Sequence, residues 1–227
     1  MITAGGGRRL GEIAGIILAG GRNSRFPIKK GFIRIGGIAI IERNLCLMRS
    51  LFRHVMISTN MPELYFYLGA PLVGDVLPSR GPLSGIYSAL INSHDPAVFV
   101  VACDMPFVET GVISLICGKY EERTVKERFD AVIPVFGDEP QPLFGVYCKT
   151  ALHALEDGIM NDKVSIKLFL REIRTLYVDE TDVRAADPKG SSFVNINTMN
   201  DYEMITGNKG MRGLPRMTDA AVPESKN

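Results

Sequence analysis

The chain of 227 residues has no tryptophan and no marked excess of either charge. Its 26 basic and 25 acidic residues leave a formal net charge of +1. Proteins that bind nucleic acids through the phosphate backbone usually carry a clear basic surplus. The charge balance therefore gives no reason to expect a nucleic-acid partner.

Paired cysteines are also missing. Cys46, Cys103, Cys117 and Cys148 are scattered along the chain without a CxxC motif. This spacing is not that of a zinc site or a redox dithiol. Three of the four have apolar neighbours, as small buried hydrophobic residues do. We therefore expect a reduced, cytoplasmic protein.

No apolar stretch approaches the roughly 20 residues of a membrane-spanning helix. Arg8 and Arg9, followed by the apolar residues 13–20, resemble a short signal peptide. However, this apolar run follows Glu12 and gives way to Arg22 almost at once. A buried first strand explains it better than a signal peptide, so we expect no membrane partner.

Short apolar runs alternate with helical patterns over most of the chain. This alternation is typical of βαβ units. It predicts a Rossmann-like α/β fold with a mostly parallel central sheet and helices on both faces. Strands are expected at 13–18, 54–59, from 73, 98–102, 131–135, 143–147, 174–178 and 193–194. Helices are expected at about 38–51, 82–92, 110–120, 150–155 and 165–172, and after 197.

The predicted domain covers residues 13–206 as one unit. Residues 1–12 contain three consecutive glycines and two arginines and are expected to form a loose arm. From residue 207 the chain is rich in glycine, proline and charge without any period, which predicts a disordered tail over 207–227.

Polar residues and glycines follow several of the predicted strands. They are Gly20, Gly21, Asn60, Asp75, Asp104 and Asn197. Ligands of open α/β sheets bind beyond the carboxyl ends of the strands. These residues are therefore the first candidates for a binding site.

The loop after the first strand has the composition of a phosphate-binding loop. Gly20 and Gly21 let the backbone approach a ligand closely. Backbone amides in such a loop can hold phosphate oxygens while Arg25 and a lysine neutralise charge. The loop matches neither the P-loop nor the dinucleotide motif. The alternative is a tight turn with solvated cations.

Asp104 comes directly after the most strand-like segment, 98–102. Magnesium prefers one or two carboxylates together with substrate phosphates and water. Asp104 is therefore a candidate Mg²⁺ ligand. The alternative is a side chain that caps the following turn.

Two further loops have a candidate role. The segment from Asp75 to Gly81 and Pro82 leads into a helix and can shape a base pocket, or it is only structural. Asn195 and Asn197 would share one face of a strand, because strand side chains alternate. One of their amide oxygens would then complete a metal or phosphate site, unless the segment merely caps a helix.

These segments, in this order, resemble the molybdenum cofactor guanylyltransferase (MobA) family, a branch of the nucleotide-sugar-type nucleotidyltransferases. The matching stretches are LAGGRNSRF…KK (18–30), ISTN (57–60), GPLSGI (81–86), ACDMPF (102–107), QPLFGVY (141–147) and NINT (195–198). They span most of residues 13–205.

The resemblance implies an enzyme that transfers GMP from GTP to the terminal phosphate of molybdopterin and releases pyrophosphate. It implies Mg²⁺ as cofactor, held by Asp104 with Asn197 as a second contact. Lys30, Arg25 and Asp104 would be catalytic. Molybdoenzymes or cofactor-carrier proteins are candidate protein partners. The nucleotide site would be lined by Leu18, Ala19, Gly20, Gly21, Lys30, Asn60, Asp75, Gly81, Pro82 and Asp104.

The loop departs from the family pattern, which usually reads Arg-Met-Gly-x-Asp-Lys. Here Pro27 replaces the glycine, and Lys29 stands where an acidic residue is usual. The active lysine is therefore Lys30 or Lys29. Alternative functions are a cytidylyltransferase for the same cofactor, another sugar-phosphate or small-molecule nucleotidyltransferase, and a non-catalytic carrier. The sequence leaves the oligomeric state and the receiving molybdoenzyme open.

Overall fold

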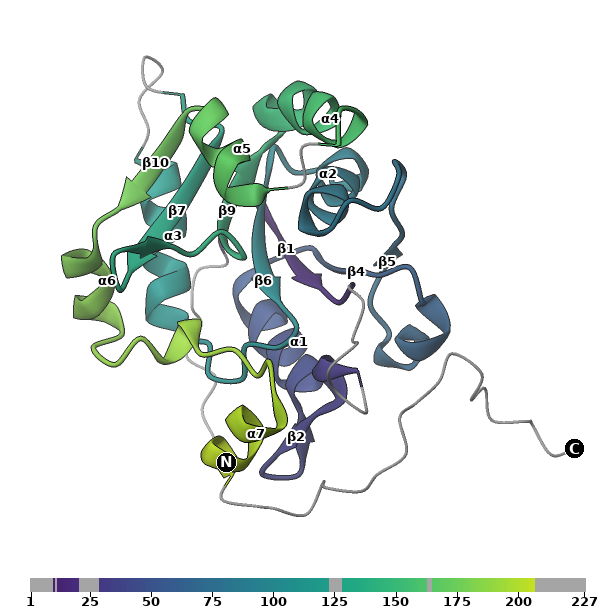
Figure 1. The fold of residues 1–227 in the computed structure, drawn as a ribbon, viewed down its shortest axis with the longest axis vertical. Helices are drawn as coiled ribbons and strands as arrows, with labels where there is room; N and C mark the ends of the chain where they lie inside the picture. The colour runs from purple at the N-terminus through teal and green to yellow at the C-terminus, as the bar shows by residue number, and fades with distance from the viewer. Residues whose placement is uncertain (1–9, 11, 21–28, 123–127, 163–164, 207–227) are drawn as a thin grey trace, which may run out of the picture.

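The computed structural model describes residue 10 and residues 12–20, 29–122, 128–162 and 165–206. A twisted central sheet lies between two layers of helices (Figure 1). The strands of this sheet are β1 (Ile13–Leu18), β4 (Val55–Ser58), β5 (Leu72–Val73), β6 (Ala97–Ala102), β7 (Ala131–Phe136), β8 (Glu139–Pro140), β9 (Phe144–Cys148) and β10 (Thr175–Val178).

The strand order is β10-β7-β9-β6-β1-β4-β5, with β8 paired to β7. Neighbours are parallel in the pairs β10–β7, β6–β1, β1–β4 and β4–β5. β9 is antiparallel to both β6 and β7, and β8 is antiparallel to β7. The predicted mostly parallel sheet is confirmed.

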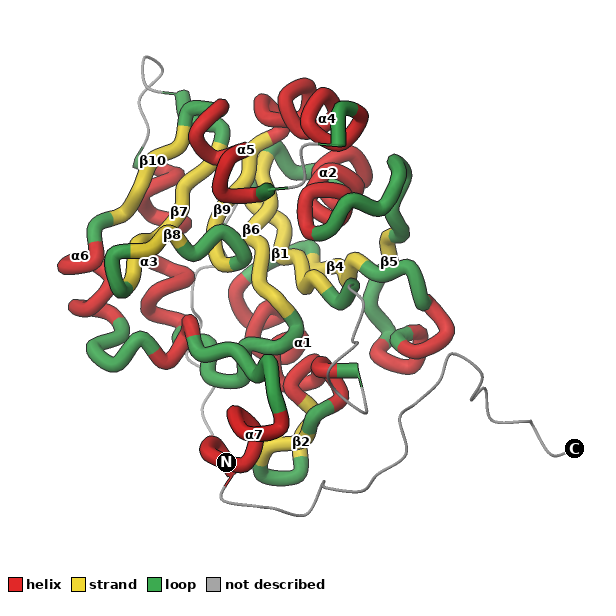
Figure 2. Tube along the Cα trace, in the orientation of Figure 1, coloured by secondary structure: helices red, strands yellow, loops and turns green. Residues whose placement is uncertain are grey.

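Helices cover both faces of the sheet (Figures 1 and 2). The helices are α1 (Ile40–Leu51), α2 (Pro82–Asn92), α3 (Thr110–Glu121), α4 (Leu152–Met160), α5 (Ile166–Glu172), α6 (Glu180–Ala186) and α7 (Met199–Thr206). The 3₁₀ turns are η1 (Lys30–Phe32), η2 (Pro62–Leu64), η3 (Phe66–Leu68), η4 (Lys149–Ala151) and η5 (Ser191–Phe193), and β2 (Arg34–Ile35) pairs with β3 (Ile38–Ala39) as a hairpin.

Alternate residues of the central strands enter two separate cores. Ile13 and Ile17 of β1 pack with buried residues of α1, α3 and α6, whereas Ala14 and Ile16 pack with α2, α4 and α5. A strand that is covered on both faces needs apolar residues at every position, which explains the unbroken run in β1. The same two-sided burial holds for β6, whose residues are all buried.

One glycine brings α2 close to the sheet. A Cβ atom at Gly85 would lie 2.8 Å from Ser58 Oγ and 3.1 Å from Leu18 Cδ2. The missing side chain therefore lets the first turns of α2 pack directly on the ends of β1 and β4. This contact places the start of α2 at the carboxyl edge of the sheet.

The structure corrects the prediction of a last strand at 193–194. Phe193 ends the 3₁₀ turn η5, and residues 194–197 form no strand. The Phe193 ring packs against Phe136 and Phe144, with ring centroids 5.1 and 5.4 Å away. The Phe193 side chain therefore covers the sheet instead of extending it, and Val194 is exposed. Helix α6 was not predicted, because Val183 is its single buried residue and its pattern is weak.

A small third hydrophobic cluster joins the last described helix, α7, to the region around the β2–β3 hairpin. Ile196 and Tyr202 pack with Ile33 and Ile40, so that α7 lies beside the β2–β3 hairpin (Figure 2). Among the described helices, none is long and apolar enough to cross a membrane. The predicted arm (1–12) and tail (207–227) lie outside the described residues, apart from Leu10 and Glu12. The single-domain boundaries stay predictions.

Candidate functional site

The carboxyl ends of three parallel strands meet at one edge of the sheet. Leu18 is in register with Ser58 of β4 and Ala102 of β6. Just beyond, the Ala19 amide donates to Ser58 O at 2.9 Å, and the Cys103 amide donates to Leu18 O at 3.0 Å. The residues that follow these strands are therefore brought together, as predicted for a ligand edge.

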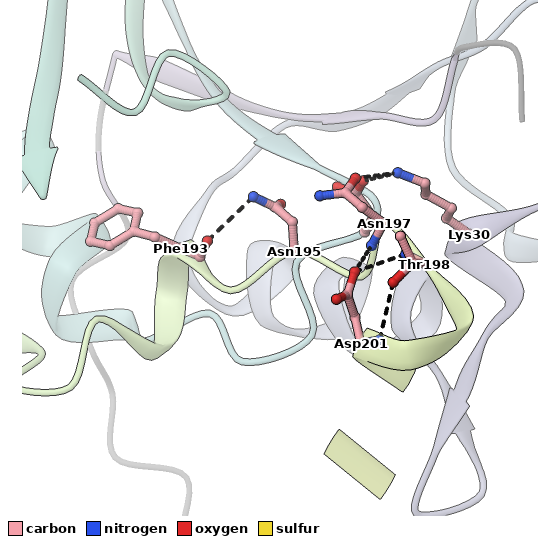
Figure 3. Close-up of polar contacts among 7 residues, drawn as sticks. Lys30, Phe193, Asn195, Asn197, Thr198 and Asp201 are labelled. Atoms are coloured by element: carbon pink, nitrogen blue, oxygen red, sulfur yellow. Dashed lines mark hydrogen bonds and ion pairs between the residues drawn. The ribbon is translucent and has the colours of Figure 1, made fainter. Parts of the chain in front are cut away.

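Lys30, Asp104 and Asn197 form a cluster at this edge. Figure 3 shows Lys30 reaching Asn197. Lys30 Nζ donates to Asp104 Oδ2 at 3.0 Å and to Asn197 Oδ1 at 2.6 Å. The Lys30 and Asp104 side chains are 22% and 17% exposed, so the pair is partly screened from water. Three residues predicted from separate motifs thus share one set of contacts.

Asn197 is held by a capping arrangement at the start of α7. Asp201 Oδ2 accepts hydrogen bonds from the backbone amides of Asn197 and Thr198, both at 2.8 Å. The Asp201 amide donates in return to Thr198 Oγ1 at 3.2 Å. Partial burial acts to raise the pKa of Asp201, but the two amides, the Thr198 hydroxyl and the Lys30 charge together lower that pKa. The cap is therefore ionised at neutral pH and fixes the backbone that presents Asn197.

The expectation that Asn195 and Asn197 share a face is wrong. Asn195 Nδ2 donates to the carbonyl of Phe193 at 3.3 Å and points away from Lys30 (Figure 3). Strand alternation does not apply here, because the segment forms no strand. Asn197 still reaches the cluster.

Asn60 and Asp75 pair with each other beyond β4 and β5. Asn60 Nδ2 donates to Asp75 Oδ2, and the Asp75 amide donates to Asn60 Oδ1, both at 2.8 Å. Each side chain keeps part of its hydrogen-bonding capacity, since an amide and a carboxylate each have more than one site. The pair forms a polar platform with both acceptor and donor groups.

The loop before α2 is anchored by serine side chains. Ser84 Oγ accepts from the Arg80 amide at 2.8 Å and donates to Pro78 O at 2.9 Å. Gly81 then has φ +72°, a conformation that favours glycine, and Pro82 begins the helix. Both predicted residues therefore lie at the amino terminus of α2, on the same edge as the end of β5.

Part of the predicted phosphate loop lies outside the described residues, including Gly21, Arg25 and Pro27. Lys29 is described, and its side chain makes no hydrogen bond or ion pair with another described residue, whereas its carbonyl accepts from the Phe32 amide at 3.0 Å. Gly20 has no described atom within 4 Å of where a Cβ would lie. The contact with Asp104 therefore distinguishes Lys30 from Lys29.

Some residues near this edge were not singled out from the sequence. Tyr65 is buried, donates to Ala19 O at 3.3 Å and stacks on Phe32, with ring centroids 5.1 Å apart. Asn44 on α1 donates to Met105 O at 3.0 Å. The Thr198-x-x-Asp201 spacing was a readable capping signal, whereas Tyr65 and Asn44 act through contacts distant in sequence.

Cys103 lies between the strand end and Asp104 but is not a nucleophile. Burial, and after it the nearby Asp104 carboxylate, raises the pKa of the Cys103 thiol to about 12, although Lys30 acts in the opposite direction. The thiol is therefore protonated at neutral pH, and thiolate is the reactive form of cysteine.

A surface groove at the opposite, amino-terminal edge of the sheet does not belong to this cluster. Arg49, Arg53, His54 and His94 line it. Because α1 and α2 both end there, basic side chains are expected next to their carboxyl ends. The candidate functional site is therefore the cluster at the carboxyl edge and not this groove.

The carboxyl edge of this mostly parallel sheet carries Gly20 after the first strand, together with Lys30 and Asp104. This is the arrangement of an α/β nucleotide-binding enzyme. Comparison with known proteins identifies its kind. The chain belongs to the MobA-like NTP transferase domain family, whose model matches residues 15–175. The protein is accordingly a nucleotidyltransferase.

Two curated relatives illustrate the similarity. The chain is 34% identical over 192 residues to a probable molybdenum cofactor guanylyltransferase of Pelotomaculum thermopropionicum, covering 84% of this chain and 90% of that protein. It is 32% identical over 195 residues to a protein of the same name from Peptoclostridium acidaminophilum, covering 84% and 88%.

A solved structure has the same fold. The molybdopterin-guanine dinucleotide biosynthesis protein A of Archaeoglobus fulgidus superposes with a TM-score of 0.74 at 27% identity. The match covers 86% of this chain and 97% of that one.

Gly20→Ala is expected to leave the fold intact and weaken nucleotide binding. No described atom occupies the space of the added methyl group, so the free energy of unfolding should change by less than about 0.5 kcal/mol. A methyl group beside a bound phosphate would raise the Kd of the nucleotide about tenfold, or about 1.4 kcal/mol. Calorimetric titration and thermal melting measure both effects.

Gly118→Ala is the matched control, because Gly118 in α3 also has no described atom within 4 Å of an added Cβ. It should not alter the Kd. An unchanged Kd in Gly20→Ala would contradict a ligand at this position.

Proposed function

We propose that the protein transfers GMP from GTP to the terminal phosphate of molybdopterin, forming the guanine dinucleotide cofactor and releasing pyrophosphate. The observation that carries the proposal is the joint contact of Lys30 with Asp104 and Asn197 at the ligand edge. The names of the curated relatives, molybdenum cofactor guanylyltransferases, support the choice of substrates. A reducing cytoplasmic location, expected from the unpaired cysteines, is part of the proposal.

Mg²⁺ fits the chemistry of this cluster. Asp104 Oδ2 and Asn197 Oδ1 both contact the one ammonium group of Lys30, so a single cation can be reached by both oxygens. Oxygen ligands are those that Mg²⁺ prefers, and it needs few from the protein when phosphates and water complete its shell. Asp104 and Asn197 would hold the ion, which neutralises negative charge on the phosphates when bound.

The residues of the chain would act mainly by position and charge. An oxygen of the acceptor phosphate attacks the α-phosphorus of GTP in line, while the bond from that phosphorus to the β-phosphate bridging oxygen breaks. Pyrophosphate leaves with the electron pair of that bond. Lys30 would stabilise the negative charge on the phosphates, and the backbone of Leu18, Ala19 and Gly20 would hold them in place.

The base would lie near Asn60 and Asp75. Guanine offers both donor and acceptor groups on one edge, and the Asn60–Asp75 pair offers acceptor and donor groups in return. Gly81 and Pro82 would close the pocket at the start of α2.

The test is pyrophosphate release by the purified protein with Mg²⁺, molybdopterin and each of GTP, CTP, UTP and ATP. GTP should give a kcat/KM at least about tenfold above the other nucleotides, because a mismatched base leaves polar groups of the pocket unpaired. Equal or faster release with CTP would replace guanine by cytosine in the proposal. A nucleotide-sugar product would replace the acceptor, and no release with any nucleotide would favour a carrier.

A further inference from the structure

Asn44 is a polar residue on the buried side of α1. Its side chain is 1% exposed, and the other buried residues of α1 are apolar, namely Ile40, Ile41, Leu45 and Met48. Burying an amide in such surroundings is costly unless its hydrogen bonds are made. The position therefore requires an explanation.

The hydrogen bonds of Asn44 are only half made. Nδ2 donates to Met105 O at 3.0 Å, but Oδ1 is buried and has no hydrogen-bond partner among the residues that the structure describes. An unsatisfied buried acceptor is costly, because it has lost its hydrogen bonds to water without gaining one in the protein. That cost offsets the gain from the single bond, so an apolar residue of similar size would serve packing equally well.

The bond that Asn44 does make lies beside the cluster. Met105 directly follows Asp104, whose own carbonyl accepts from the Ile196 amide at 3.1 Å. The turn after β6 is thus held by α1 on one side and by the segment leading to Asn197 on the other. The direction of the Asp104 carboxylate depends on this turn.

We propose that Asn44 is a positioning residue, which holds the turn after β6 so that the Asp104 carboxylate and Asn197 face the same cation. The inference rests on the proposed function for the role of Asp104. Asn44 touches neither substrate nor metal. Misplacing a reactive group by about 1 Å can lower a rate about a hundredfold, so a partial loosening of this turn should be measurable.

Asn44→Leu is the variant that separates positioning from stability. It removes the donor to Met105 O and, at the same time, the unsatisfied Oδ1. The melting temperature should stay within about 2 °C of the wild type or rise, because these two changes offset each other. The turnover number should fall about tenfold, while the KM for the nucleotide changes less than about threefold.

Binding of Mn²⁺, followed by electron paramagnetic resonance, gives a readout that does not depend on turnover. With a non-hydrolysable analogue of whichever nucleotide binds the wild type, the Mn²⁺ Kd should rise at least about fivefold in Asn44→Leu. Asn44→Ala, which keeps helix propensity high, repeats the measurement should the leucine variant fail to fold.

Asn92→Leu is the matched control. Asn92 ends α2 at the opposite edge of the sheet, and its Nδ2 donates to Ser88 O at 2.8 Å. It should leave the Mn²⁺ Kd and the turnover number unchanged. Wild-type Mn²⁺ affinity in a folded Asn44 variant overturns the inference, as does a fall in stability with no change in metal affinity.

Failure of the proposed function has a different signature. Wild-type protein that releases no pyrophosphate with any nucleotide overturns the transferase reaction. The Mn²⁺ titrations and melting curves of the Asn44 variants still decide the positioning role in that case.

Discussion

Asp104→Asn should reduce pyrophosphate release about 10³-fold and leave the protein folded. The substitution keeps the size of the side chain and removes its charge, which the proposal assigns to holding the metal. Loss of one preorganised electrostatic partner typically costs about 10²–10³ in rate, and loss of a catalytic metal costs several kcal/mol more. The ion pair with Lys30 is partly exposed, so its loss should change stability by about 1 kcal/mol or less.

Asp95→Asn is the control for this experiment. Asp95 also contacts a basic residue, with its Oδ2 2.8 Å from His54 Nδ1, and its side chain is 16% exposed against 17% for Asp104. It lies before β6, at the amino-terminal edge. Both variants should melt near the wild-type temperature, and only Asp104→Asn should lose turnover. Retained turnover in Asp104→Asn would remove Asp104 from the mechanism.

Lys30→Ala should lower kcat about 10²–10³-fold, because Lys30 is the described cation that contacts both candidate metal ligands. An interaction made mainly in the transition state lowers kcat and kcat/KM together. Steady-state kinetics with GTP and molybdopterin would show this pattern.

Lys29→Ala is the neighbouring comparison and settles which lysine is active. The Lys29 side chain makes no hydrogen bond or ion pair within the described part of the chain, so kcat should fall less than about threefold. A larger effect at Lys29 than at Lys30 would reverse the assignment.

Most of the fold could be predicted from apolar runs, because strands buried on both faces carry an unmistakable pattern. β1 was placed at its observed bounds, and β6 and β7 within a residue at each end. Phe193 and Val194 show the limit of this pattern. Phe193 is apolar because it packs on the rings of Phe136 and Phe144, whereas Val194 is exposed, and a short apolar pair does not reveal what it packs against.

The candidate site was accessible from the sequence to a similar degree. Lys30, Asp104 and Asn197 could be predicted as site residues from two sources: the rule that ligands bind at the carboxyl edge of the sheet, and the family resemblance. Their mutual contacts could not be predicted, because they depend on two hydrogen bonds between distant or irregular segments. The Ile196 amide donates to Asp104 O, and the Asn197 amide donates to the Asp201 cap, and together these bonds place Asn197 within reach of Lys30. Asn44 carried no signal, since a single asparagine in a helix is ordinary until its burial is known.

The separations along the chain between the contacting residues also have a consequence for biosynthesis. Lys30 meets Asp104 across 74 residues and Asn197 across 167. At a synthesis rate of about 5–20 residues per second, roughly ten to thirty seconds pass on the ribosome between making the lysine and making its amide partner. A nascent chain can pair the early strands during that interval, but Lys30, Asp104 and Asn197 cannot come together until the segment that leads into α7 has been translated.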